Sequence, residues 1–234
     1  MVKAELIKRS PLRLLEKSIH GELKPGAIGV LASRKGVGKT ACLVHISTDK
    51  LFQNKHVIHV SFAGRTDHII SWYEDIFREI AEKRQLDDAM EVHDELIKNR
   101  VIMNFSQEGA TADQVITSLQ AMITDGHFDA NLIVVDGYDF EKGEPETLNK
   151  VKAFAAEAGI GVWFSASTHR EQPETDENGL PKLLSPYGEE IDVLITLEPT
   201  EKHVKLKLVK DYDKYPSEDL HLKLDSKSLL IAEE

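Results

Sequence analysis

Short apolar runs alternate with segments of helical periodicity through the first two thirds of the chain. The runs predict buried strands at residues 28–32, 56–62, 101–105, 132–135 and 160–165. Around and between them, apolar side chains three or four positions apart predict amphipathic helices at residues 11–19, 69–80, 115–123 and 148–158. Near-continuous apolar strands separated by helices indicate an α/β fold, in which a mostly parallel sheet is flanked by helices on both faces.

The last third of the chain has a different pattern. Strands with little helix between them are predicted at residues 191–197, 204–209 and 220–224. Polar and apolar positions alternate in the last two, so we expect an antiparallel extension of the sheet. Residues 170–188 are rich in proline, glycine and acidic side chains, which predicts a mobile loop. Because the sequence has no internal repeat, residues 1–234 predict a single domain, with residues 1–20 as a helical lead-in.

The amino-acid composition of the chain is acidic. Its 234 residues carry 29 basic and 40 acidic side chains, a formal net charge of −11. A field of this sign repels nucleic acid unless basic residues gather locally, so a nucleic-acid partner is disfavoured. No apolar run approaches the ~20 residues of a bilayer span, and the first residues lack the apolar core of a secretory signal. With Cys42 as the single cysteine, these features predict a cytoplasmic protein without a membrane partner.

The strongest local signal is the segment SRKGVGKT at residues 33–40, which follows a predicted strand and opens a helix. It fits the G-x-x-x-x-G-K-[ST] phosphate loop except that Ser33 replaces the first glycine. In such a loop the backbone N–H groups form an anion site, Lys39 neutralises phosphate oxygens and Thr40 holds Mg²⁺. The predicted nucleotide-binding residues are Ser33, Arg34, Lys35, Gly36, Val37, Gly38, Lys39, Thr40 and Ala41.

A second metal ligand is predicted at Asp136, directly after the apolar residues 132–135. A carboxylate at the end of a buried strand is typical of the Walker B position, which holds Mg²⁺, here through a water molecule. The alternative is that Asp136 merely begins a turn, since Gly137 follows it. Two strand–helix units, residues 56–85 and 101–124, separate the motifs and favour a P-loop class with one strand inserted between the phosphate-loop strand and the Walker B strand.

Together these motifs resemble the RecA-like ATPase superfamily, and within it the cores of the DnaB helicases and the KaiC proteins. The segment SRKGVGKTA at residues 33–41 resembles the DnaB version of the loop, which also lacks the first glycine. Residues 104–140 resemble the helicase segment that leads to Walker B, and residues 202–216 resemble the strand and loop that carry a basic residue into the neighbouring subunit's site. The resemblance implies a RecA-like fold, ATP and Mg²⁺ as ligands, and a homo-oligomer or a regulatory protein as partner.

The chain departs from these families where they hold the catalytic glutamate. Alignment of the segment VIHVSFAGR with the family's second strand places Ala63 at that position. A shift of one or two residues would instead make Asp67 or Asp139 the base. With Ala63 at the base position, we expect the attacking water to be poorly prepared.

The sensor and finger positions also differ. Ser167 and His169 are the candidates to replace the family's amide sensor. Lys210 matches the family's lysine that acts in trans, whereas Tyr212 falls at the arginine-finger position. The transition-state charge is then under-compensated, so we expect a protein that binds ATP and hydrolyses it slowly or not at all. Its nucleotide state would control assembly or a protein partner.

Two other functions fit parts of the sequence. An active DNA-dependent ATPase, such as a recombinase or helicase-like motor, would share the fold but needs a working base and a local basic surface. A deviant Walker A ATPase of the ParA and MinD kind is suggested by the segment KGVGKT, although Arg34 occupies its signature lysine position. The stripe Lys202, Lys205 and Lys207 is interpreted as the solvated face of a strand rather than a nucleic-acid surface.

Overall fold

The computed structural model describes residues 2–62, 64–107, 109–168 and 174–234. Within these residues a single sheet has the strand order β3-β2-β4-β5-β1-β6-β7-β8-β9. The strands are β1 (Ile28–Arg34), β2 (His56–Ser61), β3 (Arg100–Asn104), β4 (Ala130–Asp136), β5 (Gly161–Thr168), β6 (Val193–Pro199), β7 (Val204–Asp211), β8 (Glu218–Leu224) and β9 (Ile231–Glu233). Neighbouring strands from β3 to β6 are parallel, and those from β6 to β9 are antiparallel. The predicted α/β class, with a mostly parallel sheet and an antiparallel C-terminal part, is therefore confirmed.

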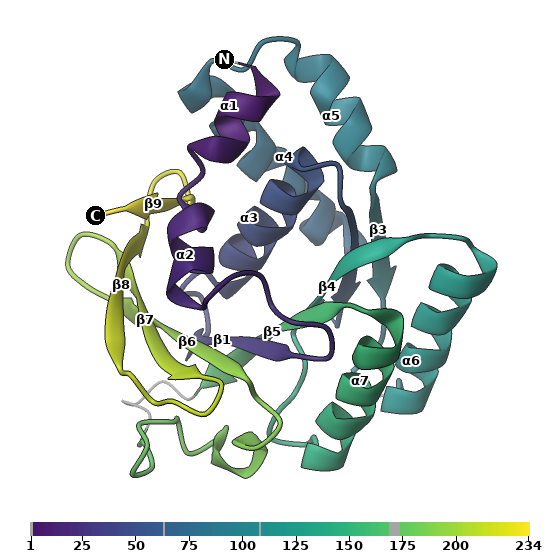
Figure 1. The fold of residues 1–234 in the computed structure, drawn as a ribbon, viewed down its shortest axis with the longest axis vertical. Coiled ribbons are helices and arrows are strands. Elements are labelled where there is room, and N and C mark those ends of the chain that lie inside the picture. The colour runs from purple at the N-terminus through teal and green to yellow at the C-terminus, as the bar shows by residue number, and fades with distance from the viewer. Residues whose placement is uncertain (1, 63, 108, 169–173) are drawn as a thin grey trace.

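Helices surround this sheet (Figure 1). They are α1 (Lys3–Lys8), α2 (Leu12–Ser18), α3 (Lys39–Phe52), α4 (Thr66–Arg84), α5 (Ala89–Lys98), α6 (Ala112–Gln120), which continues into the π-turn η1 (Ala121–Asp125), α7 (Pro145–Ala158) and the 3₁₀ turn η2 (Ser185–Tyr187). Apolar side chains of α1 to α5 belong to one buried cluster, and those of α6 and α7 to a second. None of the helices in the described ranges combines the length and the apolar character needed to cross a membrane.

The order of the strands confirms the strand predicted between the phosphate-loop strand and the strand that ends at Asp136. β5 pairs with β1 on one side and with β4 on the other, so one strand lies between the phosphate-loop strand and the strand that ends at Asp136. The apolar spacing did not predict α5 or β9. Both are short, and α5 buries only Val92 and Leu96.

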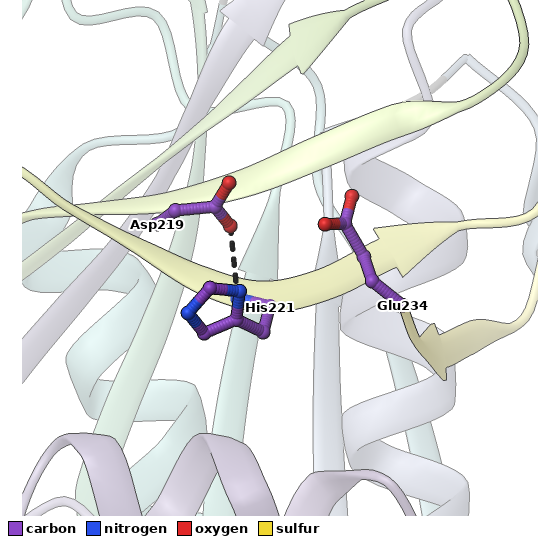
Figure 2. A group of neighbouring side chains, drawn as sticks. All are labelled: Asp219, His221 and Glu234. Carbon is purple, nitrogen blue, oxygen red and sulfur yellow. Dashed lines mark hydrogen bonds between the residues drawn. The ribbon is translucent and has the colours of Figure 1, made fainter.

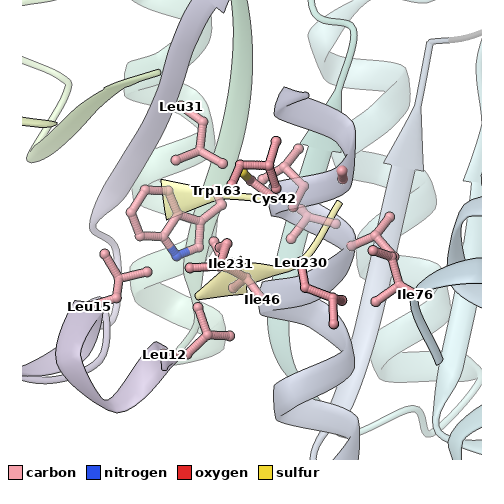
Figure 3. Close-up of a cluster of buried hydrophobic side chains, with 14 of the residues drawn as sticks. Leu12, Leu15, Leu31, Cys42, Ile46, Ile76, Trp163, Leu230 and Ile231 are labelled. Carbon is pink, nitrogen blue, oxygen red and sulfur yellow. The ribbon is translucent and has the colours of Figure 1, made fainter. Parts of the chain in front are cut away.

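The core beneath α3 is built around Trp163 of β5. Figure 3 shows its indole among apolar side chains that include Leu15 of α2, Cys42 of α3 and Ile231 of β9. Gly29 of β1 lies opposite Trp163, and a Cβ on Gly29 would come within 2.5 Å of the indole, so only glycine leaves room for the ring. Cys42 is fully buried, and burial raises the pKa of its thiol to about 12. This packing fixes α3 on the sheet.

The segment predicted as a mobile loop is partly described, from residue 174 onward; residues 170–173 lie outside the described residues. Asp176 closes a turn by accepting hydrogen bonds from the backbone N–H groups of Asn178 and Leu180, both at 2.9 Å. Tyr187 is buried, and its hydroxyl donates to the carbonyl of Phe140 at 2.9 Å. Leu180, Leu184 and Tyr187 therefore anchor the second half of this segment in the buried cluster that α7 shares.

Candidate functional site

The predicted phosphate loop connects the end of β1 to the start of α3, at the carboxyl edge of the parallel strands. Gly36 and Gly38 have φ angles of 81° and 120°, in the left-handed region that favours glycine. A Cβ on Gly38 would also lie 2.2 Å from Leu224 Cδ2 of β8. The loop therefore needs glycine at residue 38 for its backbone conformation and for its contact with β8.

Exposure differs along this loop. Arg34, Lys35 and Gly36 are exposed, Val37 and Gly38 are half-buried, and Ala41 is buried at the start of α3. The outer arm of the loop is thus open to solvent, and its inner arm packs on the core. This leaves the exposed backbone accessible to a ligand.

Lys39 is buried, with 7% of its surface exposed. Its ammonium donates to the carbonyls of Ser33 and Arg34 at 3.0 and 2.9 Å, and its Nζ lies 3.4 Å from Ser33 Oγ. Burial lowers the pKa of Lys39 to about 8, although the nearby Asp136 carboxylate opposes this shift. Ser33, which replaces the first glycine of the motif, therefore helps to hold the lysine over its own loop.

Thr40 and Asp136 meet, as the motif predicts. Thr40 Oγ1 donates to Asp136 Oδ2 at 2.8 Å, which joins the first turn of α3 to the end of β4. Ser165 Oγ donates to Asp136 Oδ1 at 2.6 Å and accepts the backbone N–H of Gly137 at 2.9 Å. Both carboxylate oxygens therefore have a hydroxyl partner, and the carboxylate is held in a fixed orientation.

Ser165 was not among the predicted site residues, although its neighbour Ser167 was. Both side chains lie on the same face of β5 because they are two positions apart. Ser167 lies opposite Ser33 at the exposed end of the strands, whereas Ser165 is one step deeper and buried. Only the register between β4 and β5 decides which of the two serines reaches Asp136. A serine within a buried strand is a weak signal of such a role.

The other predicted catalytic residues are placed as follows. Ala63 and His169 lie outside the described residues. Asp67 pairs with Arg65 next to it, with Nη2 to Oδ2 at 2.5 Å. Asp139 accepts hydrogen bonds from the backbone N–H groups of its own loop. In this structure both carboxylates are thus engaged by neighbours in sequence.

Lys210, the expected residue in trans, points into its own chain. It is buried, and its ammonium donates to the carbonyls of Gly188 and Ile191, both at 2.5 Å. Burial lowers the pKa of Lys210, and the carboxylate of Asp192 acts in the opposite direction. As placed, this lysine ties β7 to the segment before β6 instead of reaching a neighbouring subunit. Tyr212, at the arginine-finger position, lies under the ammonium of Lys24 at 4.2 Å.

A buried polar pair joins α4 to β2, the strand next to the one that carries Asp136. His59 is fully buried, and its Nδ1 lies 3.1 Å from the hydroxyl of Tyr73 on α4. Burial lowers the pKa of His59 to about 4, so the imidazole is neutral at physiological pH. Arg100 lies over the Tyr73 ring at 4.2 Å. No sequence pattern brings these residues together, because they come from three separate elements.

The opposite face of the sheet behind Asp136 is apolar. A cavity of about 220 Å³ lies there between α6 and α7. Val135 and Phe164 line it, and each directly precedes one of the two polar residues of the site, Asp136 and Ser165. The alternation of strand side chains therefore sends one residue of each pair to the cavity and the other to the polar cluster.

Comparison with known proteins leaves this site to be interpreted from its own geometry. A scan of the chain against models of protein families gives no match, and a search of curated proteins finds no similar sequence. The arrangement itself has a buried lysine, a hydroxyl and a fixed carboxylate around an exposed glycine loop. These groups are suited to hold a phosphate chain together with a hard cation.

Proposed function

We propose that the protein binds ATP with Mg²⁺ at the phosphate loop, residues 33–41. The observation that carries this proposal is the 2.8 Å contact between Thr40 and Asp136, made beside a loop that ends in a buried lysine. Backbone N–H groups of the loop would bind phosphate oxygens, and the Lys39 ammonium would exchange its two carbonyl partners for them. The loop and Lys39 would thus bind the phosphate oxygens, and Thr40 and Asp136 would hold the Mg²⁺ ion.

The two predicted metal ligands fit Mg²⁺ by chemistry and by position. Both offer oxygen, which Mg²⁺ prefers. The 2.8 Å hydrogen bond from Thr40 Oγ1 to Asp136 Oδ2 holds the carboxylate beside the hydroxyl, so Thr40 would bind the ion directly and Asp136 would hold it through a water molecule. Ser165 would keep the carboxylate in this orientation. The bound ion would neutralise phosphate charge.

We further propose that the chain is a RecA-like ATPase. Support comes from the position of β5 between the phosphate-loop strand and the Asp136 strand, and from the resemblance of residues 33–41 and 202–216 to the DnaB and KaiC families. The same resemblance favours ATP over GTP, and the sequence carries no N-K-x-D guanine motif.

Slow or absent hydrolysis is part of this proposal. Its basis in sequence is Ala63 at the position of the catalytic glutamate. A second support is Lys210, whose ammonium is engaged by two carbonyls of its own chain. A protein that binds ATP without rapid turnover can use the bound nucleotide to control a slower event. We propose that this event is self-assembly or binding of a regulatory protein.

A titration with a fluorescent ATP analogue in the presence of Mg²⁺ tests the site. Lys39→Ala should weaken binding by at least about tenfold, because hydrogen bonds to charged groups contribute about 1.5–3 kcal/mol each. Lys17→Ala is the control, since it removes the same charge from an exposed position of α2, outside the loop. It should change affinity by about threefold or less, the effect of an exposed charge. Equal losses in the two variants, or no binding by the wild type, would overturn the assignment.

A DNA-binding assay on the same protein distinguishes the proposed function from the alternative, a DNA-dependent motor. The basic stripe that could contact DNA is partly neutralised, because Lys205 pairs with Asp219 at 3.0 Å and Lys207 lies 3.9 Å from Glu198. Anisotropy with a labelled random DNA duplex should therefore show weak binding at physiological salt. Submicromolar binding with a steep salt dependence would instead favour the motor.

A further inference from the structure

A second group of metal-ligating side chains lies far from the phosphate loop in sequence, on the antiparallel extension. Asp219 and His221 come from β8, and Glu234 follows β9. Figure 2 shows the three side chains on neighbouring strands. One ligand atom of each lies within 4.8 Å of the others, and all three residues are exposed. We name this group the His221 cluster.

The backbone brings the three residues together through an irregularity in the sheet. Between β7 and β8 the register shifts after Leu206, so β8 gains extra residues around His221. His221 has a φ of 52°, which is unusual for a residue that is not glycine. Its carbonyl accepts the backbone N–H of Glu234 at 3.0 Å, which brings Glu234 alongside it. Bulges of this kind commonly redirect a side chain.

The two carboxylates of the His221 cluster already share one cation. Lys205 Nζ lies 3.0 Å from Asp219 Oδ2 and 3.8 Å from Glu234 Oε1. A second imidazole is also close, since His203 Nε2 lies 3.0 Å from Glu234 Oε1. The place between the carboxylates is therefore suited to positive charge.

We propose that the His221 cluster binds a divalent transition metal of the Zn²⁺ class, with Asp219, His221 and Glu234 as ligands. The imidazole favours Zn²⁺, Co²⁺ or Ni²⁺ over Mg²⁺ and Ca²⁺, which prefer oxygen alone. The ion takes the place of the Lys205 ammonium, and His203, whose Nε2 lies 3.0 Å from Glu234 Oε1, would hold that carboxylate in place. The proposal does not depend on nucleotide binding.

A metal at this place would join β8 to the residue that follows β9. β9 in turn contacts the phosphate-loop helix, because the backbone N–H of Ile231 donates to Nδ1 of the buried His45 on α3 at 2.9 Å. Leu224, at the end of β8, is the residue that leaves no room for a side chain on Gly38. Metal binding should therefore stabilise the packing of the extension on α3, and we expect a rise in melting temperature.

Calorimetric titration of the full chain with Zn²⁺, without nucleotide, tests the site. We expect one ion per chain, and a loss of affinity of at least about tenfold in both Asp219→Asn and His221→Ala, because each removes a ligand. Glu218→Gln is the matched control, since it removes a carboxylate next to Asp219 on the same strand and should bind like the wild type. No saturable binding, or unchanged binding by His221→Ala, would overturn the proposal.

Lys205→Met separates a metal site from a simple network of ion pairs. If the ammonium competes with the metal, its removal should tighten Zn²⁺ binding severalfold, because both carboxylates are released. If the ion pairs of Lys205 only join the strands, Lys205→Met should bind Zn²⁺ no more tightly than the wild type. Thermal melting with and without Zn²⁺ shows whether each variant is folded. A Zn²⁺-induced rise for wild type and Lys205→Met but not for His221→Ala supports the site, and an equal rise in all three contradicts it.

Discussion

Raising the pH above 8 should weaken ATP binding through Lys39. Burial lowers the pKa of this lysine to about 8 in the free protein, from the ordinary lysine value of 10.5. The triphosphate binds the charged ammonium, so affinity follows the charged fraction in the free protein. With a pKa of about 8, this fraction falls from about 0.9 at pH 7 to about 0.1 at pH 9. We therefore expect the dissociation constant to rise about tenfold between these values.

The same shift predicts the opposite trend for the stability of the free protein. Between pH 8 and 10.5 the unfolded chain holds a proton on Lys39 that the folded chain has lost. The contribution of this group to the free energy of unfolding therefore rises with pH in that window. As the pH rises, the affinity for ATP should fall while the contribution of Lys39 to the free energy of unfolding rises. A loss of binding at pH 9 therefore cannot be attributed to unfolding caused by this lysine.

Titrations with a fluorescent ATP analogue at pH 7, 8 and 9, at fixed Mg²⁺ and ionic strength, measure the effect. The second pKa of a phosphate is about 6, so the ligand itself changes little over this range. Lys39→Arg is the control, because a guanidinium stays charged throughout and should give a flat profile, even if its affinity is lower. A wild-type profile as flat as that of Lys39→Arg would refute the reasoning.

Three further predictions concern the same site. Gly38→Ala should lower the free energy of unfolding in urea by about 1–3 kcal/mol, because a Cβ would lie 2.2 Å from Leu224 Cδ2 at a φ of 120°; the same substitution should cost less in a Leu224→Ala background, where the clash is removed. Ser165→Ala removes one hydrogen bond to Asp136, worth about 1 kcal/mol, and should therefore raise the Mg²⁺ concentration needed for tight nucleotide binding about fivefold. Nucleotide binding measured without Mg²⁺ should be unchanged. Ala63→Glu should speed phosphate release, since a general base contributes about 10²- to 10⁴-fold; a wild-type rate on the order of 1 s⁻¹ would contradict the proposed slow turnover.

The main elements could be predicted from sequence because each buries its own regular set of apolar side chains. The elements that escaped prediction depend on contacts made elsewhere in the chain. α5 contributes only Val92 and Leu96 to the core, and the three residues of β9 gain support from the imidazole of His45. Three residues are too few to show a period in β9, and α5, although its apolar positions are helically spaced, buries only two of its ten residues.

Parts of the candidate site could likewise be predicted from sequence, and other parts could not. The phosphate loop and Asp136 are local patterns at the ends of strands, so sequence alone places them at one edge of the sheet. The contact of Ser165 with Asp136 depends on the register between β4 and β5, which a helix joins rather than a tight turn that would set the register. The inward position of Lys210 depends on carbonyls at residues 188 and 191 that no motif marks. Cross-strand contacts of this kind become visible only once the sheet order is known.

The strands beyond the parallel sheet are joined to the phosphate loop at two places. Leu224 of β8 lies against Gly38, the residue before α3, and Ile231 of β9 donates to His45 in the middle of that helix. A loop packed this closely cannot shift toward β8 unless Leu224 moves as well. A shift of the loop toward β8 on binding a phosphate chain would therefore also displace β8. If nucleotide state controls a partner, these strands are where we expect the partner to detect it.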